Sequence, residues 1–186
     1  MSILVITISL VACQPATTSP QPPPYSITAE GNTKVYSNYK YGFSFSICNN
    51  PDFEFAENYG KAVAAQIGPL LADLKHRIGI YVMVDKVPKN TNLDDYLKAG
   101  MKEAENTLTD FAIISEKNTT VSDLQAKLSL YTYTINMNDE DFKFKNTLVA
   151  FIKNDTVYGL KYDTPEEFYD QYVECFNLLL STFKLR

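Results

Sequence analysis

The alternation of apolar and polar residues divides most of the chain into strands. In several runs every second residue is apolar, which is the period of a strand that has one face in a core. The strands predicted in this way cover residues 41–47, 61–67, 76–87, 111–117, 124–135, 142–152 and 157–162, and a short extended piece is expected over 53–59. In 76–87 both alternating sets are apolar, so we expect this part of the sheet to be covered on at least part of each face.

Polar segments are predicted to end several of these strands. Gly68-Pro69 closes the strand 61–67, Asn118–Thr120 forms a turn after 111–117, and Asn136–Asp141 forms a hairpin loop. Residues 25–36 are polar, with a turn signal at Gly31-Asn32, and are predicted to be a transition into the domain.

Two segments have the pattern of helices. Asn92 is a suitable N-cap for a helix over 92–108, and the apolar residues of that segment make one stripe. The stripe consists of Leu93, Leu97, Met101, Ala104 and Leu108. Before the second helix, Thr164 is predicted to cap, Pro165 to take the first helical position and Glu167 to complete a capping box.

These elements predict an α+β domain with a mainly antiparallel sheet. The later strands are joined by short turns, which cannot make parallel crossovers. One helix follows the third strand, and a long helix ends the chain. Helices on both faces of such a sheet give an α/β/α sandwich.

The first residues have the pattern of an export signal. The apolar run Ile3–Val11 is too short to span a bilayer, and it ends in Leu10-Val11-Ala12-Cys13, which resembles a lipobox. Residues 1–12 are therefore predicted to be a signal peptide, and Cys13 to be lipidated. No Lys or Arg precedes Lys34, which departs from the usual charged start. The alternative is an apolar first strand or core helix.

The segment after Cys13 is predicted to be a linker. Gln14–Pro24 holds five of the nine prolines and favours an extended, semi-rigid spacer. A PxxP ligand for a partner is the weaker alternative. The expected organisation is a lipidated cysteine and Pro-rich linker over 13–35, followed by one folded domain over 36–186.

The charge and length of the chain limit its partners. The net charge of −5 argues against nucleic acid and against electrostatic adhesion to anionic lipid. Attachment to a membrane would then depend on acyl chains such as palmitate at Cys13. The 186 residues suffice for one domain with a core of its own.

Three cysteines are present, and Cys13 is assigned to lipidation. Cys48 and Cys175 remain, in a compartment where disulfides persist. Two interpretations stay open: the two residues form a disulfide bond, or each is a separately buried thiol.

Five short motifs, in their order and spacing, resemble the PsbP-like family. They are Tyr41-Gly42-Phe43, a strand ending at Pro51, Leu93-Asp94-Asp95-Tyr96, Phe111-Ala112-Ile113-Ile114 and Ser181-Thr182-Phe183-Lys184. The family includes PsbP and small prokaryotic lipoproteins of the DcrB type. The resemblance implies an α/β/α sandwich that binds or stabilises other proteins, with no common catalytic residues. A Trp that is frequent in the family is replaced here by Phe53.

The sequence offers little reactive chemistry. His76 is the single histidine, and a strand-end residue explains it better than a catalytic base. Asp139-Glu140-Asp141 could hold a hard cation, but a solvated hairpin tip explains the same residues. We therefore expect no enzyme, no catalytic residues, no cofactor and no metal site.

The predicted function is that of an extracytoplasmic lipoprotein, anchored to the cell membrane or envelope, that serves as a protein-binding or assembly module. The alternative is a carrier or sensor of a small or lipidic ligand in a pocket between sheet and helix. The tyrosines distinguish the two, because an external cluster favours a protein partner and convergence on a cavity favours a ligand. The informative ones are Tyr36, Tyr39, Tyr41, Tyr59, Tyr131, Tyr133 and Tyr169.

Overall fold

The computed structural model describes residues 23–30, 33–70, 77–137 and 139–186. The predicted signal peptide over 1–12, Cys13 and His76 lie outside the described residues, so their assignments remain predictions. Within the described ranges, no helix is long and apolar enough to cross a bilayer.

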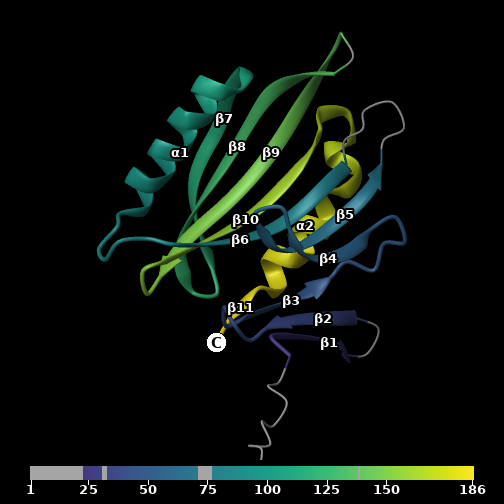
Figure 1. Cartoon of the computed structure of the whole chain (residues 1–186), viewed down its shortest axis with the longest axis vertical. Coiled ribbons are helices and arrows are strands. Elements are labelled where there is room, and N and C mark those ends of the chain that lie inside the picture. Colours follow the sequence, from purple (N-terminus) through teal and green to yellow (C-terminus); the bar gives the residue numbers. More distant parts are fainter. Residues whose placement is uncertain (1–22, 31–32, 71–76, 138) are drawn as a thin grey trace, which may run out of the picture.

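Seven strands form a large sheet in the order β4-β5-β6-β10-β9-β8-β7, and every neighbouring pair is antiparallel (Figure 1). The strands are β4 Glu54–Tyr59, β5 Ala62–Leu70, β6 Arg77–Lys86, β7 Thr109–Val121, β8 Leu124–Met137, β9 Glu140–Lys153 and β10 Thr156–Pro165. The prediction of a mainly antiparallel sheet is confirmed.

A second, smaller sheet has the order β1-β2-β3-β11. Its strands are β1 Tyr25–Glu30, β2 Thr33–Asn38, β3 Phe43–Ile47 and β11 Lys184–Leu185. The prediction that 25–36 is a transition was wrong, because it contains β1 and the start of β2, which pair antiparallel. Tyr25, Ile27 and Ala29 of β1 alternate with polar residues, which was a usable strand signal. The strand is almost wholly exposed and pairs with β2 through backbone hydrogen bonds.

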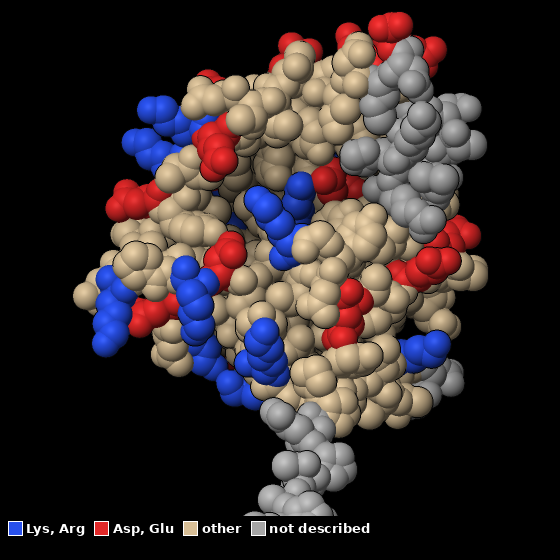
Figure 2. Space-filling model, in the orientation of Figure 1, with Lys and Arg blue, Asp and Glu red and all other residues tan. Residues whose placement is uncertain are grey.

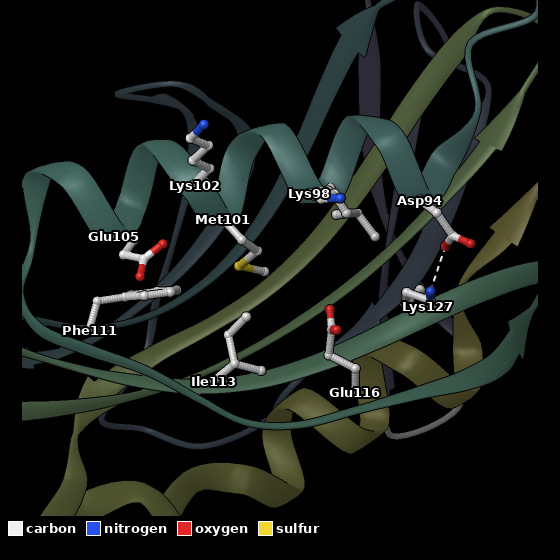
Figure 3. A pocket seen from close by; sticks show the side chains of 10 residues that line it. Asp94, Lys98, Met101, Lys102, Glu105, Phe111, Ile113, Glu116 and Lys127 are labelled. Carbon is white, nitrogen blue, oxygen red and sulfur yellow. Dashed lines mark ion pairs between the residues drawn. The ribbon is translucent and has the colours of Figure 1, made fainter.

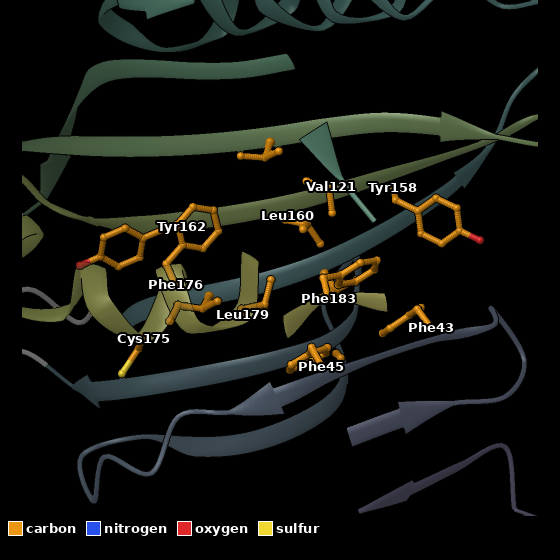
Figure 4. Packing of buried hydrophobic residues seen from close by; sticks show 14 of the residues in the cluster. Phe43, Phe45, Val121, Tyr158, Leu160, Tyr162, Cys175, Phe176, Leu179 and Phe183 are labelled. Carbon is orange, nitrogen blue, oxygen red and sulfur yellow. The ribbon is translucent and has the colours of Figure 1, made fainter. Parts of the chain in front are cut away.

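The main core lies between the large sheet, the small sheet and the C-terminal helix α2, Tyr169–Thr182. Figure 4 shows the aromatic and aliphatic side chains that meet there from β3, β10 and α2. Phe43 and Phe45 of β3 stack near Phe183, just after α2. The small sheet and α2 therefore cover one face of the large sheet together.

The helix α1, Leu93–Thr107, lies on the opposite face (Figure 1). A second cluster there joins Met101 of α1 to Tyr131 and Tyr133 of β8 and Phe144 of β9. The helix follows the sixth strand, not the third as predicted, because β1, β2 and the short β4 also precede it. The described part of the molecule is thus mainly sheet, with one α-helix on each face of its larger sheet.

Three predicted strand ends were also wrong. β5 continues through Gly68 and Pro69, where the register with β6 shifts between Ile67 and Leu70. β7 continues through Asn118–Thr120 and turns only at Ser122-Asp123. β8 and β9 likewise extend into the predicted loop 136–141. β7 is an exposed edge strand, so its polar composition resembles that of a loop.

The predicted capping box at Thr164 does not form. Thr164 and Pro165 are the last residues of β10, and a short 3-10 helix, Glu166–Phe168, precedes α2. The Thr164 hydroxyl donates to the Pro165 carbonyl, and neither helix has a side-chain cap. Pairing with Lys145 of β9 holds Thr164 in the sheet, so tertiary structure overrides the local signal.

Cys48, which follows β3, and Cys175 of α2 form a disulfide bond with a Cα–Cα distance of 5.2 Å. Of the two interpretations that the sequence left open, the structure has the paired one. The bond attaches the end of the small sheet to the helix that it packs against.

Asn92 caps α1 as predicted: its Oδ1 accepts hydrogen bonds from the backbone N–H groups of Asp94 (2.8 Å) and Asp95 (3.3 Å). Asn92→Ala is expected to lower the free energy of unfolding by about 1 kcal/mol, because two N–H groups lose their acceptor. Denaturant unfolding measures the loss, with Asn106→Ala, exposed on the same helix, as the control. Equal stability of the two variants would contradict the capping role.

Candidate functional site

The helix α1 is held above the large sheet by few side chains, and a hollow lies on each side of it. Only Leu97 and Met101 of α1 are buried, and both hollows reach these two residues. The inner cavity, about 660 Å³, lies between α1 and strands β6, β8, β9 and β10. The outer groove, about 630 Å³, lies between α1 and β7. Figure 2 shows a hollow on this face with charged side chains at its edge.

Small residues make room for the inner cavity. Gly159 of β10 and Ala150 of β9 are cross-strand partners in its floor, and Gly100 and Ala104 of α1 line it from above. Side chains of larger residues would fill this space, as they do in the core on the other face. Leu148, Met83 and Leu108 complete an apolar wall.

One end of the inner cavity is polar. Lys161 and Asp163 are two apart on β10, so both face α1, and Lys161 Nζ donates to Asp163 Oδ2 at 2.8 Å. The Tyr133 hydroxyl also donates to the Asp163 carboxylate, at 3.2 Å. Lys161, Tyr131 and Tyr133 line the cavity. Asp163 is buried, and its carboxylate is already engaged by Lys161 and Tyr133.

The environment keeps Lys161 charged. Burial by itself lowers the pKa of the ammonium group, but the charge of Asp163 and its hydrogen bond raise it, and the net shift is upward. The pKa of the Tyr133 hydroxyl is raised, first by burial and then by the charge of Asp163. At neutral pH the cavity therefore meets an ammonium group and protonated phenols, which all donate hydrogen bonds.

Asn146 of β9 lies next to this polar end. It is cross-strand partner to both Asp163 and Tyr131 and is fully buried. Its carboxamide lies close to the Tyr133 hydroxyl but forms no hydrogen bond of good geometry within the described residues. Asn146 is not among the residues that line the cavity, so it lies behind the polar end and not in its surface.

Tyr81 of β6 is the partner of Lys161 across the sheet, and its hydroxyl lies over Gly79. Burial, then the charge of Asp163, raises the pKa of Tyr81 to about 12 from 10.0. Because the folded protein keeps this proton where the unfolded chain loses it, the stabilisation is complete below about pH 10 and is lost as the pH rises towards 12.

Alkaline titration of tyrosinate absorbance tests this expectation. The difference between the wild type and Tyr81→Phe should show one phenol that ionises late, near pH 12. Tyr39→Phe, which removes an exposed tyrosine that does not contact Tyr81, is the control. If the phenol missing from the titration of Tyr81→Phe is one that ionises near pH 10, the raised pKa of Tyr81 is contradicted.

The outer groove has an apolar floor and a charged rim of both signs (Figure 3). Met101, Phe111 and Ile113 form the floor. Asp94 and Lys127 form an ion pair of 2.5 Å at one end of the groove. The rim contains Lys98 and Lys102 as well as Glu105 and Glu116, and all four are exposed. The groove therefore favours neither an anionic nor a cationic ligand.

A third feature is an apolar surface on the small sheet. Tyr25 and Ile27 of β1 and Tyr39, just after β2, are exposed large side chains, with Ile27 at 46% and Tyr39 at 51%. Tyr25 and Ile27 lie on one face of the β1–β2 hairpin, and Tyr39 lies on the other face with Ser26. We call Tyr25 and Ile27 the hairpin surface. The Ser26 and Tyr39 hydroxyls share a hydrogen bond of 2.8 Å, and the Arg186 guanidinium lies 5.3 Å from the Tyr39 ring centre.

The tyrosines singled out from the sequence do not gather in one place. Tyr36 is in the main core, Tyr39 and Tyr59 are exposed, and Tyr41 and Tyr169 are partly buried. Tyr131 and Tyr133 converge on the inner cavity. Sequence reasoning missed Lys161 and Asp163, although two charged residues at alternate positions of an apolar strand were a usable signal.

One of the acidic residues weighed as cation ligands has a structural role, as do two acidic residues at the start of α1. Asp141 accepts a hydrogen bond from Asn136 Nδ2 at 2.8 Å beside the β8–β9 turn, and Asp94 and Asp95 lie in the first turn of α1. In the part of the chain that the structure describes, no three His, Cys, Asp or Glu residues are grouped so that they could hold a metal ion.

Solved structures share this arrangement of sheets and helices. Cyanobacterial PsbP (CyanoP) from Synechocystis sp. PCC 6803 superposes with a TM-score of 0.61 at 14% identity, covering 86% of this chain and 98% of CyanoP. The chain has a PsbP-like fold. LpqN of Mycobacterium tuberculosis, involved in cell envelope biogenesis, has a TM-score of 0.58 at 13% identity, with coverage of 77% and 84%.

The Ran-binding protein Mog1p of Saccharomyces cerevisiae has the same PsbP-like fold, with a TM-score of 0.55 at 11% identity and coverage of 83% of this chain and 95% of Mog1p. No protein-family model and no curated protein sequence matches the chain. The likeness is one of fold, as the sequence resemblance implied, and it assigns no ligand or partner.

Proposed function

We propose that this PsbP-like chain is an extracytoplasmic lipoprotein of the cell membrane or envelope that binds another envelope protein and has no catalytic role. The apolar leader and the cysteine at position 13 support the lipid anchor. Two proteins of the same fold support the role: LpqN is involved in cell envelope biogenesis, and Mog1p binds Ran.

The observation that carries the proposal is the hairpin surface. Exposed Tyr and Ile side chains on a paired hairpin form a rigid apolar patch, and Tyr is enriched where proteins bind one another. The Pro-rich segment leads directly into β1, so this surface belongs to the part of the domain next to the tether. A partner in or near the membrane would meet it first.

Crosslinking in intact membranes followed by affinity purification tests the partner. Tyr25→Ser/Ile27→Lys should abolish a specific crosslinked product, because it removes ring area and places charge in the patch. Ile114→Ser, which changes an exposed apolar residue of β7, should leave the product unchanged. A wild-type protein recovered alone, or a product lost only in Ile114→Ser, would overturn the proposal.

The anchor is tested separately. Cys13→Ala should move the protein from the membrane fraction to the soluble fraction and remove its labelling by palmitate, since one thioether and the amine carry the acyl chains. If palmitate does not label the wild-type protein, the lipid anchor is contradicted. The crosslinking experiment then still tests the binding surface.

A second candidate function is favoured by the inner cavity. Its volume of about 660 Å³ lies within the range of small-molecule sites, about 300–1,000 Å³, and its wall is apolar with a few convergent polar groups. This combination supports a carrier or sensor of a small or lipidic ligand held between the sheet and α1.

A further inference from the structure

We infer that the inner cavity takes an amphiphile with an anionic, oxygen-rich head group, such as the carboxylate of a fatty acid. The head group is bound at Lys161 and Tyr131, and the apolar chain lies beneath α1. This assignment rests on the second candidate function and names its ligand class.

The head group follows from the donors at the polar end. Lys161 donates one N–H to Asp163 and has two more N–H donors, and Tyr131 also lines the cavity. Asp163 is buried and is engaged by Lys161 and Tyr133, so it holds the ammonium group in place. A cationic head group would meet the Lys161 charge, and a carboxylate or phosphate would satisfy the donors.

The chain follows from the shape of the rest of the cavity. From Lys161 the floor continues through Leu148 to the small pair Gly159 and Ala150, with Met83 against Gly159. The apolar stripe of α1, including Ala104, roofs it. Burial of the methylene groups of the chain against these apolar side chains favours binding.

The far end of the cavity is open and polar. Tyr96 donates a hydrogen bond of 3.0 Å to Asp85, and both residues line the cavity with Lys61, which is exposed. A ligand whose alkyl chain is longer than the cavity can extend into solvent between these side chains. The donors at the Lys161 end therefore define the head-group position, and the mixed rim does not.

Isothermal titration of the full chain with dodecanoate, below its micelle concentration, tests the inference. Dodecyl phosphate distinguishes a phosphate from a carboxylate head group. Dodecanol has a neutral hydroxyl in place of the anionic head group, and dodecyltrimethylammonium has a cationic one. The anionic probes are expected to bind about tenfold or more tightly than dodecanol, because a charge-assisted hydrogen bond is lost with the alcohol, and the cation should not bind.

Three variants locate the site. Ala104→Phe and Gly100→Phe should fill the cavity and abolish binding; a Cβ at Gly100 has no atom within 4 Å, so the second variant is compatible with folding. Asn106→Phe, exposed on α1 and outside the cavity lining, should bind as the wild type does. Lys161→Met/Asp163→Asn, which removes both charges, should erase the preference for anionic probes.

Each outcome decides between the assignments. Equal binding of dodecanol and dodecanoate, or an anionic preference that survives in the double variant, would overturn the head-group assignment and leave the carrier function standing. Binding that persists in both cavity-filling variants would place the ligand elsewhere. No binding of any probe to the wild type would overturn both the inference and the second candidate function.

Discussion

Replacing Cys48 and Cys175 together by alanine is expected to lower the free energy of unfolding by about 3–5 kcal/mol. The two cysteines are separated by 127 positions, so their bond closes most of the described chain into one loop. Opening a loop of that length restores much entropy to the unfolded state, on the order of 5 kcal/mol in the chain-entropy account. Cys175 is also buried beside Phe176 and Leu179, so its loss removes a little core packing.

Denaturant unfolding of the double variant, compared with the wild type with and without reductant, measures this effect. Reduced wild-type protein and the double variant should have similar unfolding midpoints, both below that of the oxidised protein. Cys13 is retained in every sample, so that the comparison reports on one bond. A variant as stable as the oxidised wild type would show that packing alone holds β3 against α2.

Lys161→Met is expected to destabilise the protein by about 3 kcal/mol or more. The ammonium group is the partner of Asp163, which is only 12% exposed at its side chain. Methionine has nearly the shape of the lysine stem but leaves the Asp163 carboxylate as a buried charge held by Tyr133 alone. Removing one member of a buried pair costs more than the pair itself contributes, because desolvation of the remaining charge is uncompensated.

The double variant Lys161→Met/Asp163→Asn separates these effects. It should recover most of the lost stability, since no unpaired charge remains and an amide can still accept from Tyr133. Thermal and denaturant unfolding of the two variants, measured side by side, show how strongly the effects of Lys161 and Asp163 on stability depend on each other. If Lys161→Met alone is as stable as the double variant, then water reaches Asp163 freely and the pair is not buried in solution.

The sequence determined those elements whose residues carry the signal locally. The strands of β6, β8, β9 and β10 have an apolar face, so their period is visible in any window. The helix α1 has both its stripe and its cap, and Asn92 does what its position predicts. The candidate pairing of Cys48 with Cys175 and the mainly antiparallel sheet also came from the chain itself.

Only the tertiary structure decided where chemistry gathers. Thr164 is in a strand because β9 pairs with it, so the local capping signal failed there. Lys161, Asp163 and Tyr133 come together from two non-adjacent strands, β10 and β8, across β9. Register between strands is a long-range property, set by how faces are buried, and no single stretch of sequence contains it.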